Sequence, residues 1–597
     1  MKPSAPSPGA PAPAGANGNP RAARPFPPRS GRIAPLLGFS VFALWFFLFA
    51  FQPGVPRSDD FGYLRSILGT LERGHPYTYE WLAPYGAVFS SVCAALYRLT
   101  GNFYLSAWGF QAFCALAVFP LLYRLLAARL RPGPAAALTL AFATFPLCFA
   151  KAADFHGSMS TLALFLGALL FFESGGIAGF FLAAFLALAN RQSHLALLLL
   201  PAWSAAAAFR ARRDPLAAFS GWEAWLAGSA FAAAAVALHL RMNRTYAMAN
   251  AVFTGSGGGR ILSVTLALAF GCFAAMACLA VCGAAFRSPW ESLKANLRRP
   301  ALPIASTLLL LAMARVWPPH LLMTDTPLFG FAGWPQVNAA APWILIACAW
   351  FLDRRLLAPS PHAALIGGFI LIACLRGVWW DYYFLEILAV CLLLAASQAS
   401  REDPTRTCPA AEARAAWTRG GAVAVALLLA ANLGYAYLLR VQMDKQKLSV
   451  AVLERLEREG RAGVDGMTGA TFGYLGWKLF DYFLANEGRT YGELADFLGY
   501  VRRDRIVIET HVPWRRAFKG ALPAQALLLD TGTCSIGFAR LPYRVADLRG
   551  PDSALSIMGR PMSLDPARFR SPRWPLDNRE WKVLIDSLSP GRPARNR

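Results

Sequence analysis

The stretch IAPLLGFSVFALWFFLFAFQPGVPRSDDFGYLRS, residues 33–66, joins a long apolar run to a polar segment that carries two adjacent acids. Residues 33–52 contain no charged side chain, and about 20 apolar residues are enough to cross a bilayer as a helix. Asp59 and Asp60 follow where the chain would leave the membrane. The whole chain has only 34 acids among 597 residues, so an acid pair at this point needs a physical reason.

The composition indicates an all-α polytopic membrane protein. The chain is 56% hydrophobic and 15% charged, whereas globular domains carry about 25% charged residues. Its formal charge is +24, and in the apolar part of the chain Lys and Arg fall in short runs between apolar blocks, which is the pattern of the positive-inside rule. No basic and aromatic stripe is present, so we expect no nucleic-acid partner.

The apolar runs and the basic runs together predict 13 spans. The tail 1–32, rich in Pro, Ala and Gly, is expected to be disordered and cytosolic, and every multi-arginine run between the predicted spans then falls on the cytosolic side. The short turn 173–176 carries no positive charge and is the weakest point of this orientation. The predicted spans are 33–52, 104–128, 135–151, 157–172, 176–190, 194–209, 222–240, 261–286, 301–317, 338–352, 363–379, 382–398 and 421–439.

The external loop 53–103 is predicted to contain two helices that lie along the membrane surface. The segment WLAPYGAVFSSVCAALYRLTG is apolar enough for half a span, but a crossing there would turn all later basic runs outward. The segment before it, DDFGYLRSILGTLERG, has one apolar face at helical spacing. This face contains Phe61, Leu64, Ile67, Leu68 and Leu71.

Residues 441–597 are predicted to form a small external domain of mixed α/β structure. The segments RLEREG and NEGRTYGELADFLGY indicate helices, and RIVIETHV and QALLLDTGTCSIGFARL indicate strands. An aspartic protease is a weak alternative suggested by DTG, because that chemistry needs two such loops. The domain contains no metal-ligand spacing, phosphate loop or nucleophile elbow.

Charged and polar residues gather at the predicted outer ends of the spans. A charge near the middle of a membrane costs about 2.5–3.5 kcal/mol on insertion scales, so such groups are expected to face a cavity or one another. Simpler alternatives remain: an arginine that snorkels, a core histidine, an aromatic belt at WWDYYF, and an N-cap formed by the acid pair. The residues concerned are Asp59, Asp60, Lys151, Asp154, His156, Arg191, His194, Arg241, Arg244, Arg315, His320, Asp325, Arg376 and Asp381.

This arrangement favours an enzyme that works outside the membrane with an energy-rich donor delivered through it. A polyprenyl-phosphate-linked sugar is such a donor. The reaction needs a carboxylate to accept the proton of the acceptor hydroxyl, and arginines to stabilise the departing lipid phosphate.

The first external loop resembles that of membrane glycosyltransferases of the GT-C superfamily, in the branch of protein O-mannosyltransferase-like and aminoarabinose transferases. The order of acid pair, surface helix, Pro84-Tyr85 and a second helix ending in YRLTG carries the resemblance. The resemblance implies catalysis by Asp59 with help from Asp60. Leu82 and Ala83 stand where the family often has a basic residue. The substrate-binding residues are predicted by position as Arg57, Tyr85, Asp154, His156, Arg191, His194, Arg376, Asp381 and Tyr382.

The sequence therefore predicts a glycosyltransferase of the bacterial inner membrane, with its N-terminus cytosolic and its C-terminal domain, 441–597, periplasmic. The transmembrane domain is expected to span 33–440. The donor would be a polyprenyl-phosphate sugar and the acceptor a lipid, glycan or protein of the envelope, with inversion at the anomeric carbon. Some members of the superfamily use a divalent cation, which an adjacent acid pair is able to hold. The alternatives are a transporter or lipid flippase, and a non-catalytic membrane scaffold.

Overall fold

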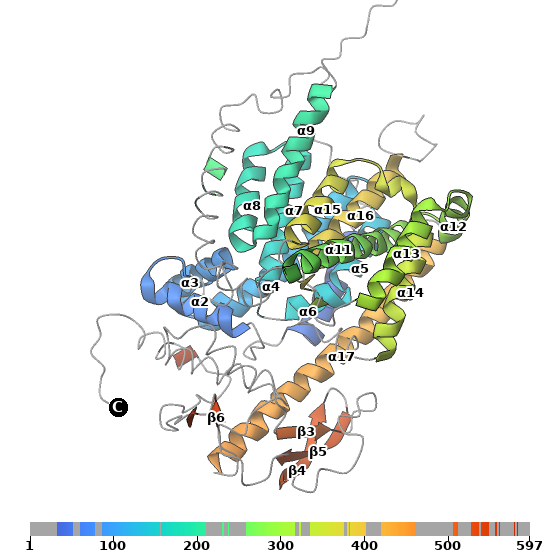
Figure 1. Ribbon diagram of the computed structural model, residues 1–597. Helices are drawn as coiled ribbons and strands as arrows, with labels where there is room; N and C mark the ends of the chain where they lie inside the picture. The colour runs from blue at the N-terminus through green and yellow to red at the C-terminus, as the bar shows by residue number, and fades with distance from the viewer. Residues whose placement is uncertain are drawn as a thin grey trace, which may run out of the picture.

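The computed structural model describes most of the helical part of the chain and a small sheet (Figure 1). The described residues are 33–51, 60–77, 86–153, 155, 157–210, 258–316, 322–323, 335–374, 379–380, 383–401, 419–459, 506–510, 527–536 and 539–547, with scattered residues in 228–237 and 556–582.

The described part of the chain is mostly helical. Its helices are α1 (Ile33–Trp45), η2 (Phe46–Ala50), α2 (Asp60–Arg73), α3 (Ala87–Thr100), η4 (Leu105–Gly109), α4 (Phe110–Ala127), α5 (Pro132–Ala143), α6 (Pro146–Ala153), α7 (Ser158–Ser174), α8 (Ile177–Asn190), η5 (Gln192–Leu198), α9 (Leu199–Arg210), α11 (Gly258–Ala284), α12 (Pro289–Arg298), α13 (Ala301–Val316), α14 (Pro335–Phe351), η8 (Arg354–Leu357), α15 (Pro361–Cys374), α16 (Phe384–Arg401) and α17 (Arg419–Arg458). The strands are β1 (Leu322–Met323), β2 (Trp379–Trp380), β3 (Ile506–Thr510), β4 (Leu527–Ile536), β5 (Ala539–Asp547), β6 (Ser556–Ile557) and β7 (Arg560–Pro561).

Among the described residues, four helical segments are long and apolar enough to cross a membrane. Each has at least 18 residues, and at 1.5 Å per residue such a helix is about 27 Å or longer, close to the thickness of the hydrocarbon core. A fifth candidate is the pair α5 and α6, which is bent by 59°. The four segments are Ile33–Ala50, Leu105–Ala127, Val264–Ala284 and Gly420–Val441.

A described helix lies over every predicted span except 222–240, where only scattered residues are described. Several of these helices are shorter than a full span or interrupted. The predicted span 135–151 is broken, because Pro146 lacks the N–H that would continue α5 and starts α6 instead. The predicted span 194–209 begins as the 3₁₀-helix η5. The apolar runs thus located the helices but not their interruptions.

One polar cluster ties together the ends of four helices on the predicted cytosolic side. Arg129, which follows α4, donates through its guanidinium to Glu173 near the end of α7 and to the Ser397 hydroxyl of α16, with Nε 2.6 Å from Oγ. His362 at the start of α15 places Nε2 3.7 Å from a Glu173 carboxylate oxygen. The turn 173–176 therefore lies at the same end of the bundle as the basic run 124–131.

The opposite ends of α7 and α16 define a second polar region. Ser158 begins α7 and lies 15 residues before Glu173, while Glu386 lies in the first turn of α16 and 11 residues before Ser397. At 1.5 Å per residue the two regions are about 17–22 Å apart along the helix axes. The bundle thus has a basic, ion-paired end and, at the opposite end next to α2 and α3, a second polar region.

Both helices predicted in the first loop are present, but α2 is more enclosed than a surface helix. All residues from Tyr63 to Thr70 are buried, including the polar Arg65, which is 2% exposed. The chain after α2 folds back over its polar face. Arg65 pairs with Glu72 at 3.4 Å and lies 5.7 Å from the ring of Tyr77. The protein thus covers this stretch of α2 on both its apolar and its polar side.

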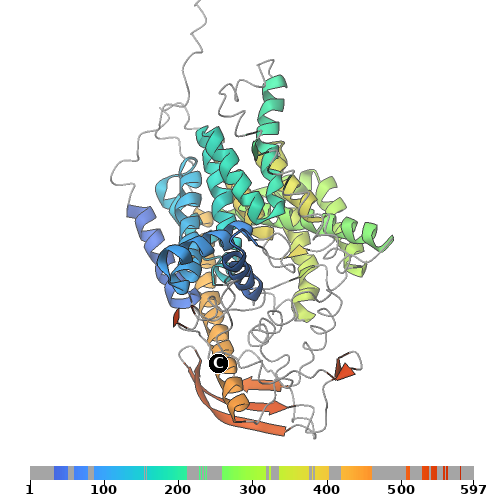
Figure 2. The ribbon, with the colours of Figure 1, turned by 90° about the vertical axis from the view of Figure 1, so that its left-hand side faces the viewer.

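The helix α17 is 40 residues long and runs from the bundle to the sheet (Figures 1 and 2). Its apolar part packs on α5, where the Asn432 amide donates to the Ala141 carbonyl at 3.0 Å. Arg440 donates to the Leu48 carbonyl at 2.9 Å. Near the far end, Arg455 is bonded to Asp530 of β4. The predicted boundary between the membrane and external domains, at 440–441, falls inside this continuous helix.

The strands β3, β5 and β4 form an antiparallel sheet in that order (Figure 1). The strands β3 and β4 lie within the segments that the sequence predicted as strands, whereas most of β5 lies beyond them. Asp530 of the DTG triplet lies within β4 and accepts a hydrogen bond from the Tyr543 hydroxyl at 3.1 Å. This environment gives Asp530 a partner in the sheet and does not add support for the protease alternative.

Candidate functional site

The candidate site is built around an interruption of the chain between α8 and η5. The helix α8 ends at Asn190, and Arg191 is extended, with φ −157° and ψ 127°. The Arg191 amide still donates to the Ala187 carbonyl at 2.8 Å, so the last turn of α8 is closed before the chain turns. The extended residue and the following 3₁₀ turn bring Asn190, Arg191 and His194 into the interior, where all three are buried.

Arg191 is held by a buried carboxylate and a hydroxyl. Its Nη1 lies 3.1 Å from Glu386 Oε1 and its Nη2 donates to Ser158 Oγ at 2.7 Å. The Arg191 and Glu386 side chains are 4% and 1% exposed. The ring of Tyr383 lies 5.9 Å from the guanidinium carbon. Breaking such a buried pair by removing one partner typically costs about 3–5 kcal/mol, so this contact fixes α8, α7 and α16 relative to one another.

His194 is the third member of this cluster. Its Nδ1 is 3.1 Å from the carbonyl oxygen of Arg191, and its Nε2 is 3.4 Å from the same Glu386 oxygen. The second distance is long for a hydrogen bond, so this is an electrostatic contact. The imidazole is fully buried between the rings of Phe165 and Phe369, at centroid distances of 5.6 and 5.5 Å. Apolar packing therefore sets the position of the histidine beside the ion pair.

Asn190 connects the interruption to the first external loop. Its Oδ1 accepts from the backbone amides of Val88 and Phe89 at 3.1 and 3.0 Å, and its carbonyl accepts from the Gly86 amide at 3.0 Å. Its Nδ2 donates to Ser160 Oγ at 2.9 Å. The side chain thus caps the N-terminus of α3 from another part of the chain, in the way that an N-cap residue does locally.

The first turn of α2 packs against the same place. Gly86 has φ +73°, and a Cβ there would lie 2.4 Å from the Tyr63 ring, so the turn before α3 requires glycine. A Cβ at Gly157 would lie 3.1 Å from the same ring and 3.5 Å from Gly86 Cα. Since α2 begins at Asp60, three residues before Tyr63, its start lies close to the starts of α3 and α7. These elements converge around Asn190.

The structure brings together only some of the residues predicted for the site. Arg191 and His194 share the buried cluster. Asp60 is the first residue of α2. The other predicted residues lie outside the described part of the chain: Arg57, Asp59, Tyr85, Asp154, His156, Arg376, Asp381 and Tyr382.

Sequence reasoning missed the partners of Arg191. Glu386 is an acid inside an apolar helix, which signals that a cation must lie nearby, but its partner is 195 residues away in the sequence. Asn190, Ser158 and Ser160 gave no signal, because single polar residues at helix ends are common. In the described residues, no group of three or more His, Cys, Asp or Glu side chains is arranged to hold a metal ion.

Comparison of the chain with protein-family models, with curated proteins and with solved structures gives no match.

Proposed function

We propose that this protein is a membrane glycosyltransferase that moves a sugar from a polyprenyl-phosphate donor to an envelope acceptor on the outer side of a bacterial inner membrane. One observation carries the proposal furthest. The start of α2 at Asp60, the second acid of the pair, lies near the polar interruption at Arg191, through the contacts of Tyr63 with Gly86 and of Gly86 with Asn190. An acid next to buried cationic and hydroxyl groups is what transfer from a lipid phosphate requires.

In the proposed reaction Asp59 accepts the proton of the acceptor hydroxyl. The acceptor oxygen then bonds to the anomeric carbon, the bond from that carbon to the phosphate oxygen breaks, and the lipid phosphate leaves with the electron pair. This in-line displacement inverts the anomeric centre. Asp60 assists or holds the loop. Arg191 already has Glu386 and Ser158 as partners, so in the described state it positions the interruption, and its contact with substrate remains a prediction.

The finer architecture belongs to the same proposal. We infer 13 spans, with the shorter helices α7, α8 and α15 crossing as parts of the bundle, and residues beyond the apolar part of α17 in the periplasm. The ion pair of Arg129 with Glu173 supports this orientation, because it groups the turn 173–176 with a basic run.

The test uses the full-length protein in proteoliposomes supplied with polyprenyl-phosphate hexoses and pentoses radiolabelled in the sugar, together with envelope extracts as acceptors. We expect covalent transfer by the wild type and a loss of about 10²–10⁴-fold in Asp59→Asn, which is the usual contribution of a general base. Asp60→Asn should lose less.

The matched control is Asp444→Asn, which removes an acid that pairs with Arg440 at 3.0 Å beyond the apolar part of α17. This variant should keep wild-type transfer. Full transfer by Asp59→Asn would refute the proposed role of the acid pair, and absence of transfer by the wild type with every donor would refute the glycosyltransferase itself.

A transporter or flippase is the second candidate, and one observation favours it. Interrupted membrane helices with polar residues at the break are typical of transporter substrate sites, and the bend between α5 and α6 and the break at Arg191 have this form. Movement of lipid-linked sugar across vesicles without covalent transfer would favour this candidate.

A further inference from the structure

The connection between α11 and α13 contains a short amphipathic helix whose position suggests a function of its own. The helix α12 starts at Pro289, five residues after the end of α11, and ends at Arg298, three residues before the start of α13. Because these connections are short, the two ends of α12 lie near the end of α11 and the start of α13. The helix therefore runs along the end of the bundle, where a bilayer surface would lie.

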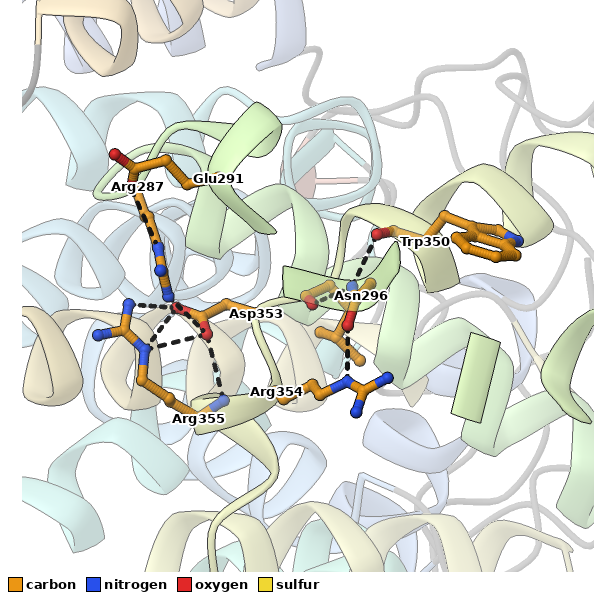
Figure 3. Close-up of polar contacts among 8 residues, drawn as sticks. Arg287, Glu291, Asn296, Trp350, Asp353, Arg354 and Arg355 are labelled. Carbon is orange, nitrogen blue, oxygen red and sulfur yellow. Dashed lines mark hydrogen bonds and ion pairs between the residues drawn. The ribbon is translucent and has the colours of Figure 1, made fainter. Parts of the chain in front are cut away.

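Polar contacts hold one face of α12 firmly against the end of α14 (Figure 3). The Asn296 side chain, 1% exposed, donates to the Trp350 and Leu352 carbonyls at 2.7 and 2.9 Å. Its Oδ1 accepts from Arg354 Nε at 2.6 Å. An asparagine with these three bonds fixes the rotation of the helix about its own axis.

A second set of contacts fixes the N-terminal side of the helix (Figure 3). Arg287, just before α12, donates to Asp353 at 3.2 Å, and Arg355 donates to the same carboxylate at 2.8 Å. Arg287 also pairs with Glu291 at 3.2 Å. The orientation of α12 is thus set by the protein and does not depend on a ligand.

The fixed rotation exposes an apolar strip beside a basic strip. At 100° per residue, Trp290 and Leu297 are about 20° apart on the helix circumference, and both are 58% exposed. Lys294 and Arg298 follow on the adjacent side and are exposed. The Lys294 ammonium lies 6.0 Å from the Trp290 ring, so the two strips meet. A helix that lies in a membrane interface has this division into Trp and Leu on one side and Lys and Arg on the other.

The charge of the region selects the lipid. The segments 287–299 and 353–355 carry six cations (Arg287, Lys294, Arg298, Arg299, Arg354 and Arg355) and two acids (Glu291 and Asp353), which leaves a net charge of +4. His362, seven residues after Arg355, contacts the Arg129 and Glu173 cluster, so α12 lies at the basic end of the bundle. A basic patch at a membrane surface attracts anionic headgroups.

We infer that α12 is a docking surface for anionic phospholipid, in which Trp290 and Leu297 enter the acyl boundary and Lys294, Arg298 and Arg299 bind the headgroup phosphates. The surface holds the α11–α14 part of the bundle at the leaflet. It is separate from the Arg191 cluster, and the inference does not rest on the proposed enzymatic function.

The test uses the full-length protein in vesicles of equal phosphatidylglycerol and phosphatidylcholine, with Trp290→p-benzoylphenylalanine as a photoreactive probe. After irradiation, lipid adducts are counted by mass spectrometry. We expect adducts at position 290 with a ratio of phosphatidylglycerol to phosphatidylcholine of about five or more, the factor that one cation near an anionic surface provides. The control probe is Leu528→p-benzoylphenylalanine in β4, where the native side chain is 52% exposed, and it should give no adducts.

A charge variant then separates headgroup recognition from apolar anchoring. Adding Lys294→Gln and Arg298→Gln to the probe protein should lower the adduct ratio towards one while lipid adducts persist. Arg124→Gln with Arg131→Gln removes the same charge from two exposed positions, one in the last turn of α4 and one just before α5, and should leave the ratio unchanged. Absence of adducts at position 290, or a ratio near one in the protein with all its cations, would overturn the inference.

Discussion

Two arginine–carboxylate clusters hold this bundle, and they differ in how much water reaches them. At the polar end beneath α2 and α3, Arg191 and Glu386 are almost fully buried and have a hydroxyl and an imidazole beside them. At the basic end, the side chains of Arg287 and Arg355 are 29% and 40% exposed around Asp353. Both clusters join elements that are far apart in the sequence.

The difference in burial determines how much each cluster contributes to stability. Burying an ion pair costs desolvation free energy, and removing one partner costs more because the other charge stays buried. Such a pair at a helix interruption therefore holds its polar groups in a fixed arrangement. An exposed pair contributes little energy and mainly selects one orientation of a helix. We therefore expect substitutions at the first cluster to have large effects and those at the second to have small ones.

The largest effect is expected for Glu386→Ala. The substitution removes the carboxylate partner of the buried Arg191 guanidinium, whose contacts with the Ser158 hydroxyl and the Tyr383 ring remain. A loss of about 3–5 kcal/mol of stability is typical for a broken buried pair. The unfolding temperature of the purified protein in lipid nanodiscs would measure it.

The conservative variant Glu386→Gln is the control for this prediction. The amide keeps a hydrogen-bond acceptor for Arg191 but removes the negative charge, so its unfolding temperature should lie between those of Glu386→Ala and the wild type. An unfolding temperature of Glu386→Ala equal to that of the wild type would show that the pair does not hold the bundle.

The second effect concerns the turn that joins α3 to the interruption. Gly86→Ala places a Cβ 2.4 Å from the Tyr63 ring and forces a non-glycine residue to φ +73°. The backbone conformation alone costs about 1–2 kcal/mol. We expect faster hydrogen exchange in α2 and the first turns of α3, measured by mass spectrometry.

Gly101→Ala provides the matched comparison. Gly101 also has a positive φ, of 64°, but a Cβ there meets no atom within 4 Å. Its exchange should change only at the end of α3. Equal effects of the two variants on α2 would mean that the contact between Gly86 and Tyr63 is unimportant.

A smaller effect is expected from the Asp353 carboxylate. Burial alone would raise the pKa of Asp353, but hydrogen bonds from Arg355 and the charges of Arg355 and Arg287 hold it below its ordinary value, which is about 3.9. A lowered pKa means that this carboxylate stabilises the folded state above the ordinary value, and that the stabilisation disappears as the pH falls through the lowered one.

The comparison with Asp353→Asn measures this contribution. At pH 6 the variant should unfold at a lower temperature than the wild type. The loss in free energy of unfolding should be about 0–1 kcal/mol, as is typical of partly exposed pairs. The difference between the two proteins should shrink as the pH falls below the ordinary carboxyl value of about 3.9 and disappear once Asp353 is protonated in the folded protein. A difference that stays constant over this range would show that the charge of Asp353 is not responsible.

The smallest effect is expected for Glu291→Gln. Glu291 is 63% exposed and pairs with Arg287 four residues earlier, and such pairs contribute about 0.3–0.5 kcal/mol. Its unfolding temperature should stay within the error of the wild-type value. A loss as large as that of Asp353→Asn would place Glu291 inside the cluster rather than at its edge.

The sequence predicted the positions of the helices because a membrane helix needs a long apolar run, and each run is visible without knowledge of its neighbours. The strands β3 and β4 were visible for a similar reason, since their β-branched and apolar residues are local signals. Most of β5, with Pro542 and two arginines, was not predicted. The interruptions were harder to predict. Pro146 gave a local signal for the bend after α5, but nothing in NRQSH shows that Arg191 is extended.

The candidate site was predictable only in part, because its contacts join distant segments. Arg191 and His194 were chosen as polar residues at the ends of two predicted spans, and the structure places them together. Their partner Glu386 is close to them only in three dimensions. The enclosure of α2 was missed for the same reason, because an apolar face shows what a helix turns inward but not what covers Arg65 on its other side.

The length of α17 has a mechanical consequence. Its 40 residues form one helix of about 60 Å, bonded to α5 through Asn432, to η2 through Arg440 and to the sheet through Arg455. Within this helix there is no joint at which the sheet can swing independently of the bundle. A force that tilts the sheet therefore tilts the helix with it. The Arg440 contact carries this motion to η2, which ends nine residues before Asp59.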